Sequence, residues 1–154
     1  MEANIRVAVV VAEFNSEITG RMLTQALKRL SQLRIVTTYV CKVPGSFDMP
    51  LIVQALLEKE DVDAVVTLGA IVKGETGHDK VIASALAKQL SELSVRHRKP
   101  VALGVSGPSM TWEQALARAE EYANRSVDSA VKMVRVHKEV MKRMANAVYP
   151  LVIE

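Results

Sequence analysis

The sequence alternates four times between a short run rich in β-branched apolar residues and a longer segment with helical spacing. The first run, IRVAVVV at residues 5–11, has no polar residue after Arg6, as expected of a strand covered on both faces. Three further strands are expected at residues 34–40, 63–72 and 100–106. This alternation predicts an α/β fold in which a four-stranded parallel sheet carries helices on both faces.

Four helices are expected after these strands. Their approximate ranges are 16–33, 49–59, 76–98 and 112–148, the last with a break near Asn124. Asn15 or Ser16 can cap the first helix, and Asp48 can cap the second. Right-handed crossovers place every strand-to-helix loop at one edge of a parallel sheet, and such sheets bind ligands at that edge.

Length, charge and cysteine content narrow the class of protein. A chain of 154 residues is expected to form one domain. The net charge of +3 is too weak to indicate a nucleic-acid partner. The single cysteine, Cys41, excludes an intramolecular disulfide and favours a cytoplasmic protein. No apolar run approaches the ~20 residues of a membrane span, so no membrane partner is expected.

Both phenylalanines of the chain, Phe14 and Phe47, lie in the expected edge loops. One interpretation is that each is a small satellite-core residue. The other is that the pair forms a flat apolar wall for a planar ligand.

The segment GETGH at residues 74–78 joins the third strand to the third helix. Gly74, Glu75 and Thr76 would present backbone N–H groups beside a helix N-terminus, which is a phosphate-binding arrangement, although a plain capped helix has the same pattern. His78 suits proton transfer near neutral pH, unless it is a solvated first-turn histidine. No second histidine stands at ligand spacing, so we expect no metal.

Arg118 and Arg125 are seven residues apart and would share one face of a continuous helix. They can form an arginine fork for an oxyanion or ordinary surface ion pairs with Glu120 and Glu121.

Four edge segments together resemble one family, the 6,7-dimethyl-8-ribityllumazine synthases. The segments are VVVAEFNSEIT, VPGSFDMP, TLGAIVKGETGHDKV and GVSGPSMTWEQALARAEEYANRS, and the match runs over about residues 7–134. The G-E-T-x-H pattern after a strand, together with P-G-[ST]-[FY]-[ED]-x-P, is specific to that family. The SGP turn resembles its archaeal branch.

The resemblance implies a three-layer flavodoxin-like fold and a homo-oligomer, either a pentamer or a 60-subunit shell of pentamers. It implies condensation of 5-amino-6-(D-ribitylamino)uracil with 3,4-dihydroxy-2-butanone 4-phosphate. Phosphate and water leave, and no cofactor takes part.

The resemblance also assigns roles. His78 matches the acid-base residue, Phe14 the aromatic stacked on the pyrimidine, and Arg118 of a neighbouring subunit a phosphate ligand. The full set of substrate-binding positions is Phe14, Ser46, Phe47, Asp48, Ala70, Ile71, Val72, Glu75, Thr76, Leu103, Arg118 and Arg125. Leu103 also comes from the neighbour, and Arg125 is one residue out of register with a basic position of the family.

Three features depart from the family pattern. Leu103 stands where many members have an aromatic residue, and Asp48 replaces a commoner glutamate. The tail, MANAVYPLVIE, is long and ends in an apolar, strand-like piece. Two alternatives remain: an archaeal-type riboflavin synthase, which lacks the G-E-T-x-H pattern, and an assembly scaffold of the same fold without turnover.

Overall fold

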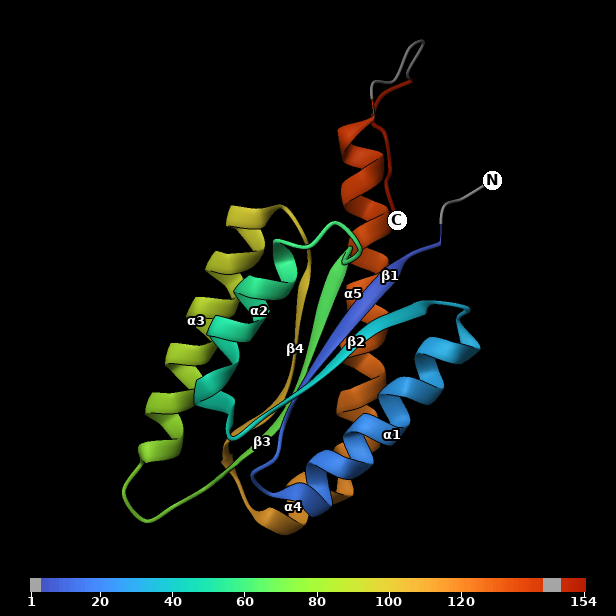
Figure 1. Ribbon diagram of the computed structural model, residues 1–154. Coiled ribbons are helices and arrows are strands. Elements are labelled where there is room, and N and C mark those ends of the chain that lie inside the picture. Colours follow the sequence, from blue (N-terminus) through green and yellow to red (C-terminus); the bar gives the residue numbers. More distant parts are fainter. Residues whose placement is uncertain (1–3, 143–147) are drawn as a thin grey trace.

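A four-stranded parallel sheet in the order β2-β1-β3-β4 forms the centre of the protein (Figure 1). The computed structural model describes residues 4–142 and 148–154. The strands are β1 (Arg6–Ala12), β2 (Val36–Val43), β3 (Ala64–Val72) and β4 (Val101–Met110). The predicted α/β class with a four-stranded parallel sheet is confirmed.

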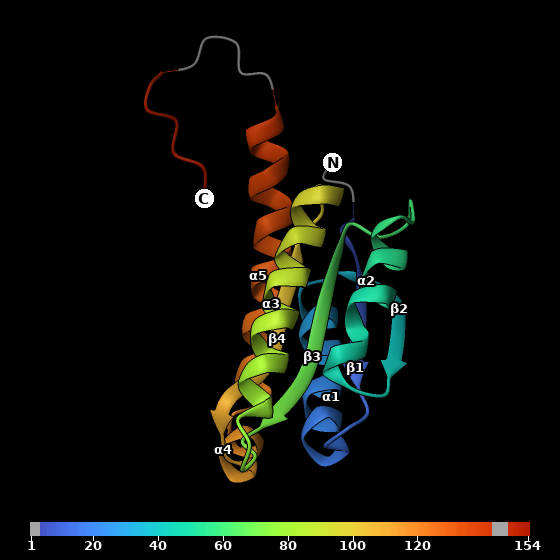
Figure 2. The same cartoon turned by 90° about the vertical axis from the view of Figure 1, so that its left-hand side faces the viewer.

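Helices cover both faces of this sheet and give a three-layer, flavodoxin-like arrangement (Figures 1 and 2). The helices are α1 (Ser16–Gln32), η1 (Ser46–Asp48), α2 (Met49–Leu57), α3 (His78–His97), α4 (Trp112–Ala117) and α5 (Ala119–Met141). α1 and α5 pack on one face, and α2 and α3 on the other. Among the described helices, none is long and apolar enough to cross a membrane.

The packing of β1 explains why apolar and polar residues do not alternate in the first apolar run. Val7, Val9 and Val11 pack into the core beneath α1 and α5. Ala8 and Val10 pack into the core beneath α2 and α3. All five residues are at most 4% exposed, so both faces of the strand require apolar side chains.

The fourth strand is longer than predicted. Residues 107–110 were expected to be loop, but β4 continues to Met110, which pairs with Val72 of β3. The register shifts between Ala70 and Val72, so residues 107–109 form a bulge opposite Ile71. Gly107 approaches Ile71 so closely that a Cβ atom would lie 2.2 Å from its carbonyl oxygen. A glycine-based bulge therefore replaces the predicted loop.

Other boundaries also differ from prediction. β2 begins at Val36, two residues late, because Arg34 takes a left-handed conformation with φ 58°. α3 begins at His78, because Gly77 before it has φ 70°. The last helix is interrupted at Arg118 and not near Asn124, which lies inside α5.

The C-terminal tail forms neither helix nor strand over residues 148–154, so the strand-like prediction is wrong there. The last turns of α5 project beyond the amino-terminal edge of the sheet, and the tail runs back beside them (Figures 1 and 2). Leu151 and Ile153 are each 39% exposed, whereas Val152 is 78% exposed. The first two are therefore more covered than Val152. Residues 143–147, which the predicted helix included, lie outside the described chain.

Candidate functional site

A hollow of about 540 Å³ lies at the carboxyl edge of the sheet, among the loops that follow β1, β2 and β3. The residues expected to bind substrate that line it are Phe14, Ser46, Phe47, Ala70, Ile71, Val72 and Thr76, together with His78. It is also lined by Asn15, Gly45, Gly74, Asp79 and Ile82. The fold therefore brings together residues that lie 64 positions apart in sequence, from 14 to 78.

Phe14 and Phe47 flank the hollow from two loops that are hydrogen-bonded to each other. The N–H of Phe14 donates to the carbonyl of Pro44 at 3.0 Å, and the N–H of Glu13 donates to that of Val43 at 2.7 Å. The two phenylalanines are 72% and 71% exposed, so neither is a core residue in the described chain. Exposed aromatic rings beside a hollow are typical of a site for a planar ligand.

Asn15 is a residue of the site that sequence reasoning treated only as a helix cap. Its backbone is left-handed, with φ 61°, and its side chain makes no capping bond. The side-chain Nδ2 donates instead to the carbonyl oxygen of Ala70 at 2.9 Å. This bond fixes the end of β3 against the start of α1. The tolerance of asparagine for this conformation is the only sequence signal for it.

The turn Ser46–Asp48 enters the hollow because Gly69 of β3 leaves room beneath it. A Cβ atom at Gly69 would lie 2.5 Å from the Ser46 Oγ. Asp48 stabilises its own turn, since its Oδ2 accepts from the N–H of Gly45 at 3.0 Å. Asp48 precedes α2 as predicted, but its side chain does not cap that helix.

The loop from Lys73 to Gly77 carries the expected phosphate-binding turn. Its residues are exposed except for Gly77, and Thr76 and His78 reach the hollow. Glu75 is exposed and does not line the hollow.

Asp79 is the second residue that the sequence analysis missed as part of the site. It is 4% exposed, and its Oδ2 accepts from the backbone N–H of Ser109 at 2.8 Å. This donor holds the pKa of the Asp79 carboxyl below its usual value, while burial opposes the shift. An acid in a helix first turn is visible in sequence, but its burial depends on the bulge in β4.

The charge in the hollow is uneven. Among the described residues that line it, none is a lysine or an arginine, and Asp79 contributes an acid. Within the described chain, no group of three or more histidine, cysteine or acidic side chains is placed to hold a metal ion. The described lining of the hollow therefore offers no lysine or arginine to pair with an anionic ligand.

Five residues expected at the site do not line this hollow: Asp48, Glu75, Leu103, Arg118 and Arg125. Leu103 is on the edge strand β4 and is 50% exposed. Arg118 is exposed at the junction of α4 and α5. Arg125 Nη1 lies 3.7 Å from Glu121 Oε1, which is the surface ion pair of the alternative interpretation. The interruption at Arg118 means that the two arginines do not lie on one continuous helix.

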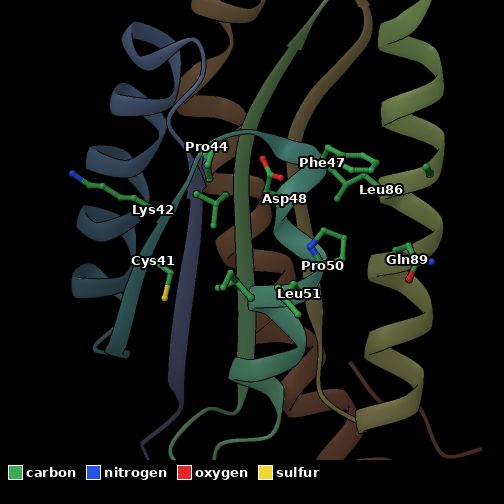
Figure 3. Close-up of a pocket in the computed structure, with 12 residues that line it drawn as sticks. Cys41, Lys42, Pro44, Phe47, Asp48, Pro50, Leu51, Leu86 and Gln89 are labelled. Atoms are coloured by element: carbon green, nitrogen blue, oxygen red, sulfur yellow. The ribbon is translucent and has the colours of Figure 1, made fainter.

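A second, larger hollow of about 810 Å³ lies beside the first, between β2, α2 and α3 (Figure 3). Phe47 lines both hollows, whereas Asp48 lines only the larger one. The larger hollow also holds Leu51, which is 76% exposed. Because Thr76 and His78 line only the smaller hollow, we place the candidate chemistry there.

The fold and these hollows define a class: a flavodoxin-like α/β protein with a candidate small-molecule site at the carboxyl edge of its sheet. A family model described as 6,7-dimethyl-8-ribityllumazine synthase matches residues 4–138. This chain, of 154 residues, therefore belongs to the 6,7-dimethyl-8-ribityllumazine synthase family.

Archaeal relatives agree with this assignment. A protein named 6,7-dimethyl-8-ribityllumazine synthase from Metallosphaera sedula is 49% identical over 141 residues, which cover 92% of this chain and 93% of the relative. One of the same name from Saccharolobus solfataricus is 52% identical over 134 residues, which cover 87% of each chain. The resemblance stated from the loop motifs is confirmed.

Proposed function

We propose that the protein condenses 5-amino-6-(D-ribitylamino)uracil with 3,4-dihydroxy-2-butanone 4-phosphate to give 6,7-dimethyl-8-ribityllumazine, a transferase reaction of riboflavin biosynthesis. Phosphate and water are released, and the chain acts as one cytoplasmic domain without a cofactor. The convergence of Phe14, Phe47, Thr76 and His78 on one hollow is the observation that carries this proposal.

The pyrimidine lies against the aromatic side of the hollow. Phe14 stacks on its ring, and residues 46–48 hold the pyrimidine and ribityl groups. Because the Ala70 carbonyl already accepts a hydrogen bond from Asn15, the backbone of Ile71 and Val72 carries most of the recognition of the ring edge.

The phosphate lies on the loop side. The buried Asp79 carboxylate occupies the first turn of α3, which weakens that helix end as an anion site. The phosphate therefore binds the amides of residues 74–77 and the Thr76 hydroxyl, outside the helix. His78 moves protons during imine formation and phosphate elimination.

Most of the rate enhancement comes from holding the two reactants together, which can lower the activation barrier by about 7–11 kcal/mol. Proton transfer by His78 adds about 10²–10⁴-fold. Glu75 does not line the hollow, so it contributes to the loop and not to proton transfer.

A neighbouring subunit completes the site. The hollow lacks a cation among its described residues, and a phosphate dianion is commonly paired with arginine. We assign that role to Arg118 of the neighbour, with Leu103 beside the ring and Arg125 nearby. The exposed apolar side chains of Phe47, Leu51 and Leu103 support burial between copies in a homopentamer or a 60-subunit shell.

The test mixes purified protein with both substrates and follows lumazine absorbance and fluorescence, while native mass spectrometry gives the size of the assembly. We expect lumazine to form, and Arg118→Ala to raise the KM for the butanone phosphate without changing the assembly. An intact assembly that yields no lumazine would indicate the scaffold alternative. Conversion of lumazine alone into riboflavin would indicate a riboflavin synthase.

A further inference from the structure

The loop between β3 and α3 is held at both ends by the same short piece of β4. At its start, the N–H of Lys73 donates to the carbonyl of Met110 at 2.7 Å. At its end, the carboxylate of Asp79 accepts from the N–H of Ser109 at 2.8 Å. Adjacent residues of one strand thus hold the two ends of a seven-residue segment, residues 73–79.

Between these two anchors the loop has little support of its own. Residues 73–76 are exposed, and a Cβ atom at Gly74 or Gly77 would meet nothing within 4 Å. The two glycines are therefore not confined by surrounding side chains. The shape of the loop depends on where its two ends are fixed.

Asp79 is suited to be the second anchor. It is 4% exposed, although acids are seldom buried without partners. Ser109 lies in the β4 bulge with φ 63°, where the regular pairing between strands is interrupted. The Asp79 carboxylate supplies an acceptor for that amide, so each group satisfies the other.

We propose that Asp79 is a positioning residue that fixes the phosphate-binding loop and His78 against the end of β4. This inference rests on the proposed function for its kinetic consequences. It concerns one side of the site only, because Phe14, Ser46 and Phe47 come from the loops after β1 and β2.

Asp79→Ala removes the acceptor, whereas Asp79→Asn keeps an oxygen that can accept from Ser109. Glu60→Gln is the matched control, because Glu60 is an exposed acid before β3, at the opposite edge of the sheet. The measurements are the KM for each substrate, kcat, and amide hydrogen exchange over residues 74–78.

We expect Asp79→Ala to raise the KM for the butanone phosphate or lower kcat by about 10- to 100-fold, as for a catalytic geometry displaced by ~1 Å. The KM for the pyrimidine should change less than about twofold, and exchange over residues 74–78 should accelerate. Asp79→Asn should stay within about threefold of wild type in kinetics and exchange, like the Glu60 control.

The proposal is overturned if Asp79→Ala leaves loop exchange unchanged, or if it changes both KM values equally. If Asp79→Ala does not fold, Asp79→Asn decides: wild-type exchange supports an acceptor role, and accelerated exchange overturns it. Hydrogen exchange does not require turnover, so this result stands apart from the proposed function. An inactive wild-type protein with the expected exchange pattern would refute the reaction and keep the anchor.

Discussion

Gly69→Ala tests the relation between the sheet and the turn that enters the hollow. The new Cβ atom would lie 2.5 Å from Ser46 Oγ, 3.3 Å from Met49 Cε and 3.4 Å from Val105 Cγ2. The last two contacts are tight, but a shift of a few tenths of an ångström relieves them. The first is too short to persist, so either the Ser46 hydroxyl rotates away or the whole turn moves.

The expected loss of stability depends on whether the Ser46 hydroxyl rotates or the whole turn moves. Overpacking of a well-packed interior typically costs about 1–3 kcal/mol, and the lower end applies if only the hydroxyl rotates. Movement of the turn toward solvent would reach the upper end and would displace Phe47. A displacement of ~1 Å in a substrate-holding group can lower kcat/KM by up to about 10²-fold.

The assay is denaturant unfolding at fixed protein concentration, because the proposed subunit association would contribute to the apparent stability. Gly20→Ala is the control, since a Cβ atom there meets nothing within 4 Å and the exposed helical site should gain up to about 1 kcal/mol. Adding Ser46→Ala to Gly69→Ala should restore most of the lost stability, because the shortest clash disappears.

Unfolding of Gly69→Ala within about 0.5 kcal/mol of wild type, with unchanged kcat/KM, would refute this reasoning. So would a double variant less stable than Gly69→Ala alone. Either result would mean that the turn accommodates a methyl group beneath it without moving.

Three further predictions concern single groups. His78→Ala should lower kcat by about 10²–10⁴-fold but leave measurable turnover, and complete loss in an intact assembly would contradict the proximity argument. Asp79 has a lowered pKa because the Ser109 N–H donates to it, so its contribution to stability should be full above its unfolded value near 3.8 and be lost as the pH falls through the lower folded value. In Asp79→Asn, the free energy of unfolding should therefore fall less steeply with decreasing pH than in wild type. Tyr39 donates to Asp61 at 2.7 Å, which raises the phenol pKa, so its stabilising effect should persist below pH 10.0 and disappear as the pH rises through the folded value. An absorbance titration of wild type and Tyr39→Phe should show that the phenol lost in the variant ionises above pH 10.0, and loss of a phenol that ionises at or below pH 10.0 would count against the hydrogen bond.

Local chemistry made much of the fold predictable. The unbroken apolar run of β1 required two covered faces, and the structure has a core on each side of it. The loop motifs around Phe14, Phe47 and His78 were enough to place these residues at one edge, because right-handed crossovers between parallel strands bring every strand-to-helix loop to the same edge.

The features that could not be predicted depend on contacts between distant segments. The bond from Asn15 to Ala70 requires a left-handed asparagine, and nothing near Asn15 shows what its side chain will meet. The burial of Asp79 depends on a bulge thirty residues away. The helix interruption at Arg118 occurs without a glycine or a proline within α4 or α5.

The absence of lysine and arginine among the described residues that line the hollow has a consequence for genetics as well as for chemistry. If each pocket takes its aromatic residues from one chain and its arginine from the next, a chain that lacks Phe14 can still supply Arg118 to the pocket of its neighbour. Co-assembly of Phe14→Ala and Arg118→Ala subunits should restore up to about a quarter of the pockets to an intact composition under random mixing, whereas neither variant alone has an intact pocket.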